Sequence, residues 1–100
     1  MIYGYILQEE AQREYEISVQ WYLERSERAA TNFILAVDAA LQLICKYPQR
    51  WRNKYKNYYE LGLKKYPFTI IYTIETDKQL IFITAIYHHK RSPGKRYRKK

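Results

Sequence analysis

The residues of this chain best suited to acid–base chemistry are two adjacent histidines, His88 and His89, which end an apolar run. An imidazole titrates near neutral pH, so it can act as an acid or as a base there. Neighbouring side chains in a strand point to opposite faces of a sheet. At most one of the two therefore faces any single site, and a solvated strand end is the alternative interpretation for both.

The positive charge of the chain is concentrated at its C-terminus. The net charge is +8, and seven of the 18 basic residues lie in positions 90–100, which hold no acidic residue. The first 89 residues are therefore close to neutral. Such a basic tail predicts an acidic partner, either nucleic acid or an acidic protein segment.

A second group of cations alternates with aromatic residues between Arg50 and Tyr66. This pattern suits single-stranded nucleic acid, where bases stack on rings and cations contact phosphates. It equally suits a groove for an amphipathic peptide. A third interpretation is a loop with packed aromatics and solvated cations. The candidate groove residues are Arg50, Trp51, Arg52, Tyr55, Lys56 and Lys65.

Several other classes of site find no support in the sequence. Two adjacent histidines without a nearby acid or thiol do not make a metal site, and no glycine-rich nucleotide motif is present, so we expect no metal and no cofactor. The single Cys45 falls in an apolar helical pattern and is predicted to be a buried structural thiol. One cysteine and no signal-peptide pattern predict a cytoplasmic setting. No apolar run approaches the roughly 20 residues that span a bilayer, so we expect no membrane partner.

The elements that must position these residues follow from periodicity. Tyr3–Leu7 reads as a strand, and about Gln8–Arg25 as a helix with acidic residues in its first turn. Ser26 is a predicted N-cap for a second helix, whose apolar stripe ends at Tyr47-Pro48. The short link between the two helices predicts an antiparallel hairpin.

The second half of the chain has the composition of strands. They are predicted at Tyr58–Lys64, Phe68–Glu75 and Gln79–Tyr87, with a turn at Thr76–Lys78. The fold class is α+β, in the order β-α-α-β-β-β. We expect the helical hairpin to pack on a mainly antiparallel four-stranded sheet. We expect residues 1–89 to form one domain and residues 90–100 to form a basic tail.

The order of these elements and two short motifs resemble the RelE/ParE toxin superfamily of bacterial type II toxin–antitoxin systems. The motifs are YPFTIIY, from Tyr66 to Tyr72, and AIYHHKR, from Ala85 to Arg91. The resemblance covers nearly the whole chain. It implies a small growth-inhibiting toxin, which a cognate antitoxin neutralises by wrapping a C-terminal segment over it. An acidic segment of that antitoxin and a toxin–antitoxin hetero-oligomer are expected.

The resemblance implies one of two activities. RelE-like members cleave mRNA on the ribosome with lysines, arginines and a C-terminal tyrosine, whereas ParE-like members poison DNA gyrase without nuclease chemistry. In an ungapped alignment on Tyr72, the two lysines fall on Glu60 and Gly62, and the two arginines on Thr69 and His89. The tyrosine falls near Lys95, two residues before Tyr97. The nuclease cations are thus missing.

We therefore expect the ParE-like activity. In this hypothesis the tail contacts the target through Lys90, Arg91, Lys95, Arg96 and Arg98. The alternative is an mRNA endonuclease with a different catalytic set, in which Glu60 is the base, His89 the acid and Lys64 or Lys65 the phosphate ligand, with Tyr97 nearby. A third hypothesis is an inactive nucleic-acid- or protein-binding module that keeps only the fold.

Overall fold

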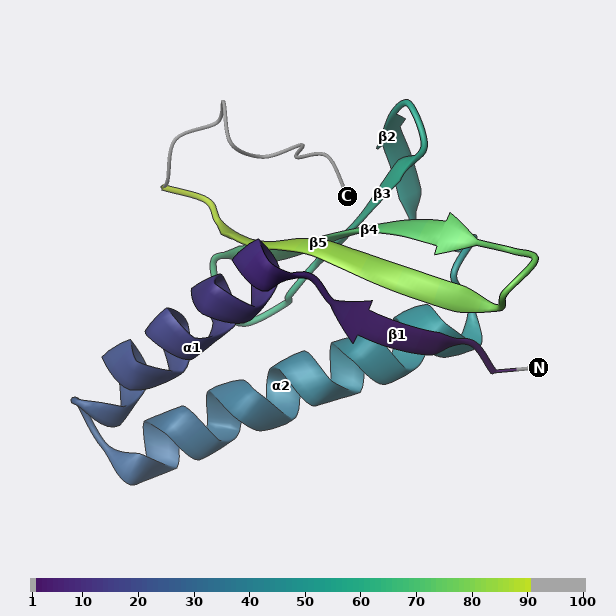
Figure 1. Ribbon diagram of the computed structural model, residues 1–100. Helices are drawn as coiled ribbons and strands as arrows, with labels where there is room; N and C mark the ends of the chain where they lie inside the picture. The colour runs from purple at the N-terminus through teal and green to yellow at the C-terminus, as the bar shows by residue number, and fades with distance from the viewer. Residues whose placement is uncertain (1, 91–100) are drawn as a thin grey trace.

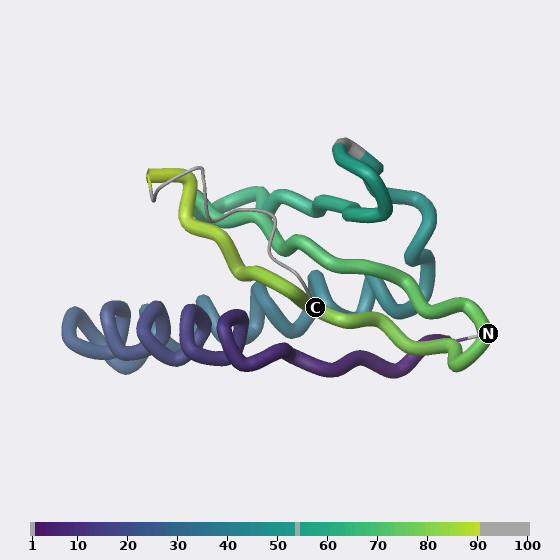
Figure 2. The backbone as a smooth tube through the Cα atoms, turned by 45° about the horizontal axis from the view of Figure 1, so that its top comes forward, coloured from purple at the N-terminus to yellow at the C-terminus, as the bar shows by residue number. Residues whose placement is uncertain are grey.

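The fold places two helices against one face of a sheet (Figures 1 and 2). The computed structural model describes residues 2–90, apart from the side chain of Lys54. In chain order the elements are β1 (Gly4–Leu7), α1 (Glu9–Leu23), α2 (Glu27–Lys46), β2 (Arg52–Tyr55), β3 (Tyr58–Gly62), β4 (Phe68–Glu75) and β5 (Leu80–His88). The predicted α+β class and order of helices and strands are confirmed. The predicted tail beyond Lys90 lies outside the described residues.

The sheet is mixed and has five strands, in the order β1-β5-β4-β3-β2. β1 pairs in parallel with β5, and the other three pairings are antiparallel. β4 and β5 lie in the centre, and their runs of β-branched and aromatic residues are mostly buried. The terminal strand β1 and the hairpin strand β2 form the two edges.

The fifth strand, β2, is the difference from the predicted four-stranded sheet. Its residues, Arg-Asn-Lys-Tyr, include no β-branched residue and show no apolar alternation, so nothing in the local sequence marks a strand. It forms because it pairs with β3, with a register shift between Asn53 and Tyr55. Pairing in the folded molecule therefore decides this element, not local propensity.

α2 is the core helix. Ser26 caps it by accepting a hydrogen bond from the backbone N–H of Ala29 at 2.9 Å, as predicted. Its buried stripe includes Phe33, Val37, Leu41 and Ile44. By length and composition alone α2 could cross a membrane, contrary to the expectation that no segment reaches that length. In this fold its buried stripe packs in the core, while Ile34, Leu35 and Leu43 of the same helix are exposed.

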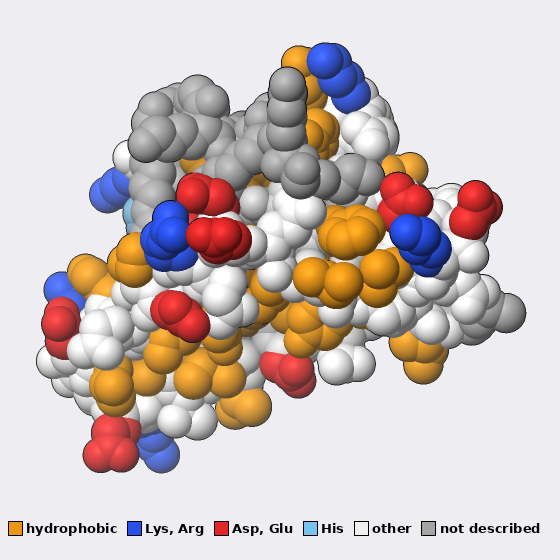
Figure 3. All heavy atoms as spheres, viewed as in Figure 1, with side chains coloured by type: hydrophobic (Ala, Val, Ile, Leu, Met, Phe, Trp, Pro, Cys, Tyr) orange, Lys and Arg blue, Asp and Glu red, His pale blue; other side chains and the backbone are white. Residues whose placement is uncertain are grey.

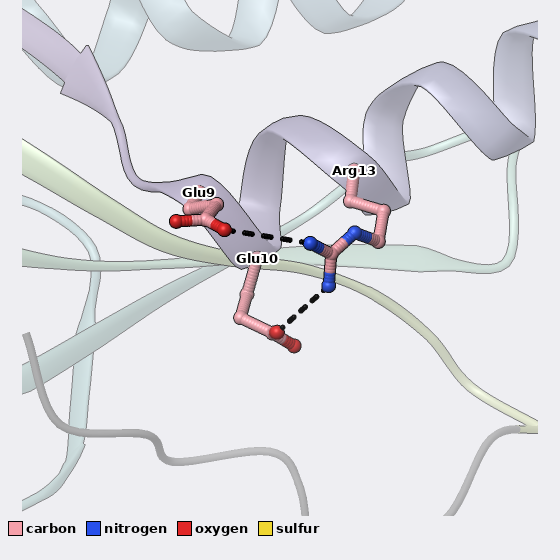
Figure 4. A network of polar contacts seen from close by, with 3 residues as sticks. All are labelled: Glu9, Glu10 and Arg13. Atoms are coloured by element: carbon pink, nitrogen blue, oxygen red, sulfur yellow. Dashed lines mark hydrogen bonds and ion pairs between the residues drawn. The ribbon is translucent and has the colours of Figure 1, made fainter.

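α1 begins with an exposed acidic turn. Arg13 lies 3.5 Å from Glu9 and 3.1 Å from Glu10 (Figure 4). These side chains are more than half exposed, so each ion pair stabilises the fold by less than about 1 kcal/mol. Unlike Ser26, the N-cap residue Gln8 makes no side-chain capping bond.

The core lies between the helices and the sheet, centred on Phe33. The Phe33 ring centroid is 4.8 Å from that of Tyr22, 5.1 Å from Phe68 and 5.4 Å from Tyr66. One side chain therefore contacts α1, β4 and the loop before β4. Cys45 is buried in the same cluster, as predicted, and burial raises the pKa of its thiol. Some apolar side chains stay exposed over the helical hairpin, at the lower left of Figure 3.

Candidate functional site

The sheet face opposite the helices carries two of the four residues of the alternative catalytic set, Glu60 and His89. Glu60 pairs with Ile71 across β3 and β4, and Ile71 packs with Ala85 and Tyr87 in a cluster separate from the main core. Thr69 lies two residues before Ile71, on this same outer face. Glu60 and Thr69 are both largely buried.

The two histidines lie on opposite faces, as strand alternation predicts. The His88 ring packs edge-on against Phe68, with centroids 4.9 Å apart, on the helix side. His89 lies beyond the end of β5, and its Nε2 is 2.9 Å from the Thr69 hydroxyl. The two positions that the alignment assigns to nuclease arginines, Thr69 and His89, thus contact each other.

The other two members of that set lie elsewhere. Lys64 follows β3 and lines a cleft on the α2 side of the sheet, and Lys65 lines the same cleft. Tyr97 lies outside the described residues. The structure therefore brings Glu60 and His89 to one face but separates both lysines from them.

The cleft between α2 and the chain around β3 has a volume of about 360 Å³. One wall is the helical row Ala36, Ala39 and Leu43, and the other is formed by Trp51, Leu63 and Tyr66, with Lys64 and Lys65 also lining it. Leu43 is 42% exposed, so this wall presents apolar surface to solvent. The result is an apolar groove with cationic side chains, which we call the α2 cleft.

The β2–β3 hairpin projects from the sheet on the side away from the helices (Figures 1 and 2). At its tip the rings of Tyr55 and Tyr58 stack with centroids 6.2 Å apart and planes 18° apart. The Lys56 ammonium lies 5.3 Å from the Tyr55 ring centroid. Blue and orange side chains meet at this tip, at the top of Figure 3.

The six candidate groove residues therefore divide into separate places. Trp51 and Lys65 line the α2 cleft. Arg52, Tyr55 and Lys56 belong to the hairpin or its turn. The Arg50 guanidinium lies near the rings of Tyr47 and Trp51, at 5.7 and 5.2 Å.

The helical wall of the α2 cleft was not among the predicted site residues. Its spacing, Ala36, Ala39, Ala40 and Leu43, is that of a helix face, and it lies beside the buried core stripe. An apolar row wider than one core stripe is the signal in the sequence that could have identified it.

Of the predicted target-contacting residues, Lys90 is described and is exposed. Arg91, Lys95, Arg96 and Arg98 lie outside the described residues. Within residues 2–90 no three histidine, cysteine or acidic side chains come together in a way that could hold a metal ion.

Comparisons with known proteins agree with this architecture. None of the curated protein sequences matches the chain. A chain of the chromosomal ParDE toxin–antitoxin system from P. aeruginosa has the same fold, with a TM-score of 0.73, 11% identity, and coverage of 87% of this chain and 96% of that one. The isolated E. coli RelE toxin matches with a TM-score of 0.62 and 14% identity, and the match covers 92% of this chain and 89% of that toxin. A chain of the intact E. coli RelBE toxin–antitoxin complex matches with a TM-score of 0.63 and 13% identity, and the match covers 89% of this chain and 99% of that one.

At these identities the structures establish only the fold, which both toxin types share. The family model decides between them. The model for the ParE toxin of the type II toxin–antitoxin system parDE matches residues 5–93, which is most of the chain. The chain therefore belongs to the ParE toxin family within the RelE/ParE superfamily.

Proposed function

We propose that this ParE-family toxin inhibits growth by poisoning DNA gyrase, and that its basic tail contacts the gyrase–DNA target. The observation that carries this proposal is the makeup of the outer sheet face. Glu60, Gly62 and Thr69 occupy three positions where the resemblance assigns cations to RNA-cleaving members. A carboxylate beside a phosphate opposes phosphoryl chemistry, and glycine and threonine supply no charge.

A supercoiling assay with purified gyrase and relaxed plasmid tests the proposal. We expect the full chain to block supercoiling at stoichiometric amounts, and an absence of inhibition would overturn the gyrase assignment. A variant with Lys90, Arg91, Lys95, Arg96 and Arg98 replaced by Gln should lose inhibition. Lys78→Gln, which removes one positive charge in the exposed β4–β5 turn, is the control for a charge outside the tail and should inhibit as the parent does.

We further propose that the α2 cleft binds the cognate antitoxin. Its apolar walls suit the apolar face of an amphipathic segment, and Lys64 and Lys65 suit acidic residues along that segment. Leu43→Glu places a carboxylate on the wall and should weaken antitoxin binding more than about tenfold. Leu35→Glu is the control, because Leu35 is exposed on the same helix but does not line the cleft. Equal binding by both variants would contradict this location.

One contact favours a second candidate function, mRNA cleavage. His89 lies against the Thr69 hydroxyl on the same face as Glu60, so an acid and a base share one surface. Primer extension on translated message tests this candidate. Cleavage by the parent that is lost in His89→Gln and in Glu60→Gln would favour the nuclease over the gyrase poison.

A further inference from the structure

We propose that the tip of the β2–β3 hairpin is a binding site for single-stranded DNA, separate from both the basic tail and the α2 cleft. The site is made by Tyr55, stacked on Tyr58, with Lys56 as the cation in the turn. Arg52 lies at the other end of β2, opposite Glu60. Choosing DNA as the polymer rests on the proposed function, since DNA is present at the proposed target.

The first observation is the arrangement of the rings. Tyr55 is 44% exposed although its ring stacks on Tyr58, at a centroid distance of 6.2 Å. Tyr58 in turn packs against the cluster of Ile71, Ala85 and Tyr87. The exposed ring is thus held by the body of the sheet through its neighbour. A fixed aromatic surface is what an unpaired base stacks on, and every base offers such a face.

The second observation is the charge beside the rings. Arg52 and Lys56 are exposed, and the Lys56 ammonium lies 5.3 Å from the Tyr55 ring centroid. A base on the ring would bring its phosphate close to Lys56. The α2 cleft has the opposite character, because it is a concave groove with apolar walls. The hairpin therefore fits a polymer of bases and phosphates better than an amphipathic peptide.

The third observation is the backbone of Lys56. It has a φ of 49°, in the left-handed region where glycine is favoured. Gln79, in the β4–β5 turn, has a φ of 50°, so a second turn has the same backbone conformation, and none of its residues from Thr76 to Gln79 is aromatic. The two turns make a matched pair for separating the role of the lysine side chain from the role of the backbone.

Fluorescence anisotropy of labelled oligothymidylate of about 16 nucleotides, the upper end of known site sizes, measures binding by the full chain. Tyr55→Ala should weaken binding about tenfold, as expected for the loss of one base stack. Tyr5→Ala is the control, because Tyr5 is 40% exposed on the opposite edge strand, and it should bind as the parent does. The tail is unchanged in every variant, so a difference in binding between two variants comes from the substituted residue.

Lys56→Gly and Gln79→Gly should both keep or raise the thermal midpoint, because glycine relieves the same backbone conformation in each turn. Lys56→Gly alone should weaken oligothymidylate binding and lower the slope of log K against log salt by about 0.7, the value for one phosphate contact on a single strand. Equal binding by the two glycine variants would overturn the site.

Three further outcomes would also overturn it. Tighter binding of oligouridylate than of oligothymidylate would assign the site to RNA. Tighter binding of a duplex of the same length would argue against base stacking. Weakened antitoxin binding with unchanged DNA binding in Tyr55→Ala would assign the hairpin to the antitoxin. The supercoiling assay measures gyrase inhibition and the anisotropy assay measures oligonucleotide binding. The proposed function and the hairpin site can therefore each fail without the other.

Discussion

At the scale of single residues, two polar contacts, one part-buried and one buried, join elements that are far apart in sequence. β1 ends at Leu7, so the edge of β5 beyond Ile83 lacks a strand partner on that side. There the Glu14 carboxylate, from α1, accepts a hydrogen bond from the backbone N–H of Ile86 at 2.9 Å. On the other side of the core, the Tyr72 hydroxyl donates to the Pro48 carbonyl at 2.6 Å.

Glu14→Ala should destabilise the fold by about 1.5–3 kcal/mol, because it leaves the N–H of the buried Ile86 without this charged acceptor. Urea denaturation measures the change. Glu14→Gln keeps an acceptor oxygen and should lose less. Glu16→Ala, on an exposed position of the same helix, should change stability by less than about 0.5 kcal/mol. Equal losses for Glu14→Ala and Glu16→Ala would show that the contact contributes nothing.

Tyr72 should make stability depend on alkaline pH. Burial raises the pKa of Tyr72, and the neighbouring Tyr59 adds to the rise. Above pH of about 10 the unfolded chain loses this proton while the folded chain keeps it, so stability falls as pH rises. Tyr72→Phe should be less stable than the parent by about 1–2 kcal/mol at pH 7, because the Pro48 carbonyl loses its donor. The gap should narrow above pH of about 10, and a gap that stays constant would contradict the ionisation argument.

At the scale of elements, the sequence predicts those whose signal is local. β4 was predicted at its observed bounds, Phe68–Glu75, because its first seven residues are all β-branched or aromatic and a proline precedes them. The Ser26 cap was predicted because capping depends on one side chain. β2 was missed because Arg52–Tyr55 carries no strand signal and depends on β3. The sequence also did not predict that the candidate groove residues divide between the α2 cleft and the hairpin, because this division follows from the pairing of β2 with β3.

We expect opposite changes in stability when the N-cap residues of the two helices are replaced. Ser26→Ala should cost about 1 kcal/mol, because the N–H of Ala29 loses its acceptor. Gln8→Ser should stabilise the fold by about 0.5–1 kcal/mol, because Gln8 makes no capping bond and has the extended backbone of an N-cap. Its backbone bond to the Ile83 carbonyl is kept. Thermal unfolding measures both, and a loss of stability in Gln8→Ser would show that its present side chain has another role.

At the scale of the whole molecule, the sheet separates three surfaces. The helix side carries the α2 cleft, the outer face carries Glu60, Thr69 and His89, and the β2–β3 hairpin projects beyond both. Strand alternation predicts that His88 and His89 lie on opposite faces of the sheet, but it does not predict which side chain His89 contacts. The pairing of Thr69 with His89 needs the β4–β5 register, which no local pattern in the sequence contains.

Phe33 connects the helical hairpin to the sheet, so changing it tests how far these surfaces depend on each other. Phe33→Leu should lower the stability of the fold by about 1–2 kcal/mol, which corresponds to roughly 4–16 °C in thermal midpoint. Ile34→Ala, on the exposed side of α2, is the control and should destabilise the fold less. The α2 cleft has one wall on α2 and one near β3, so a loosened Phe33 contact should weaken antitoxin binding. The hairpin tip is held by Tyr58 on the sheet, so oligothymidylate binding should be unchanged at temperatures where the variant is folded. A parallel loss of both activities would show that the two sites share one packing unit and are not independent.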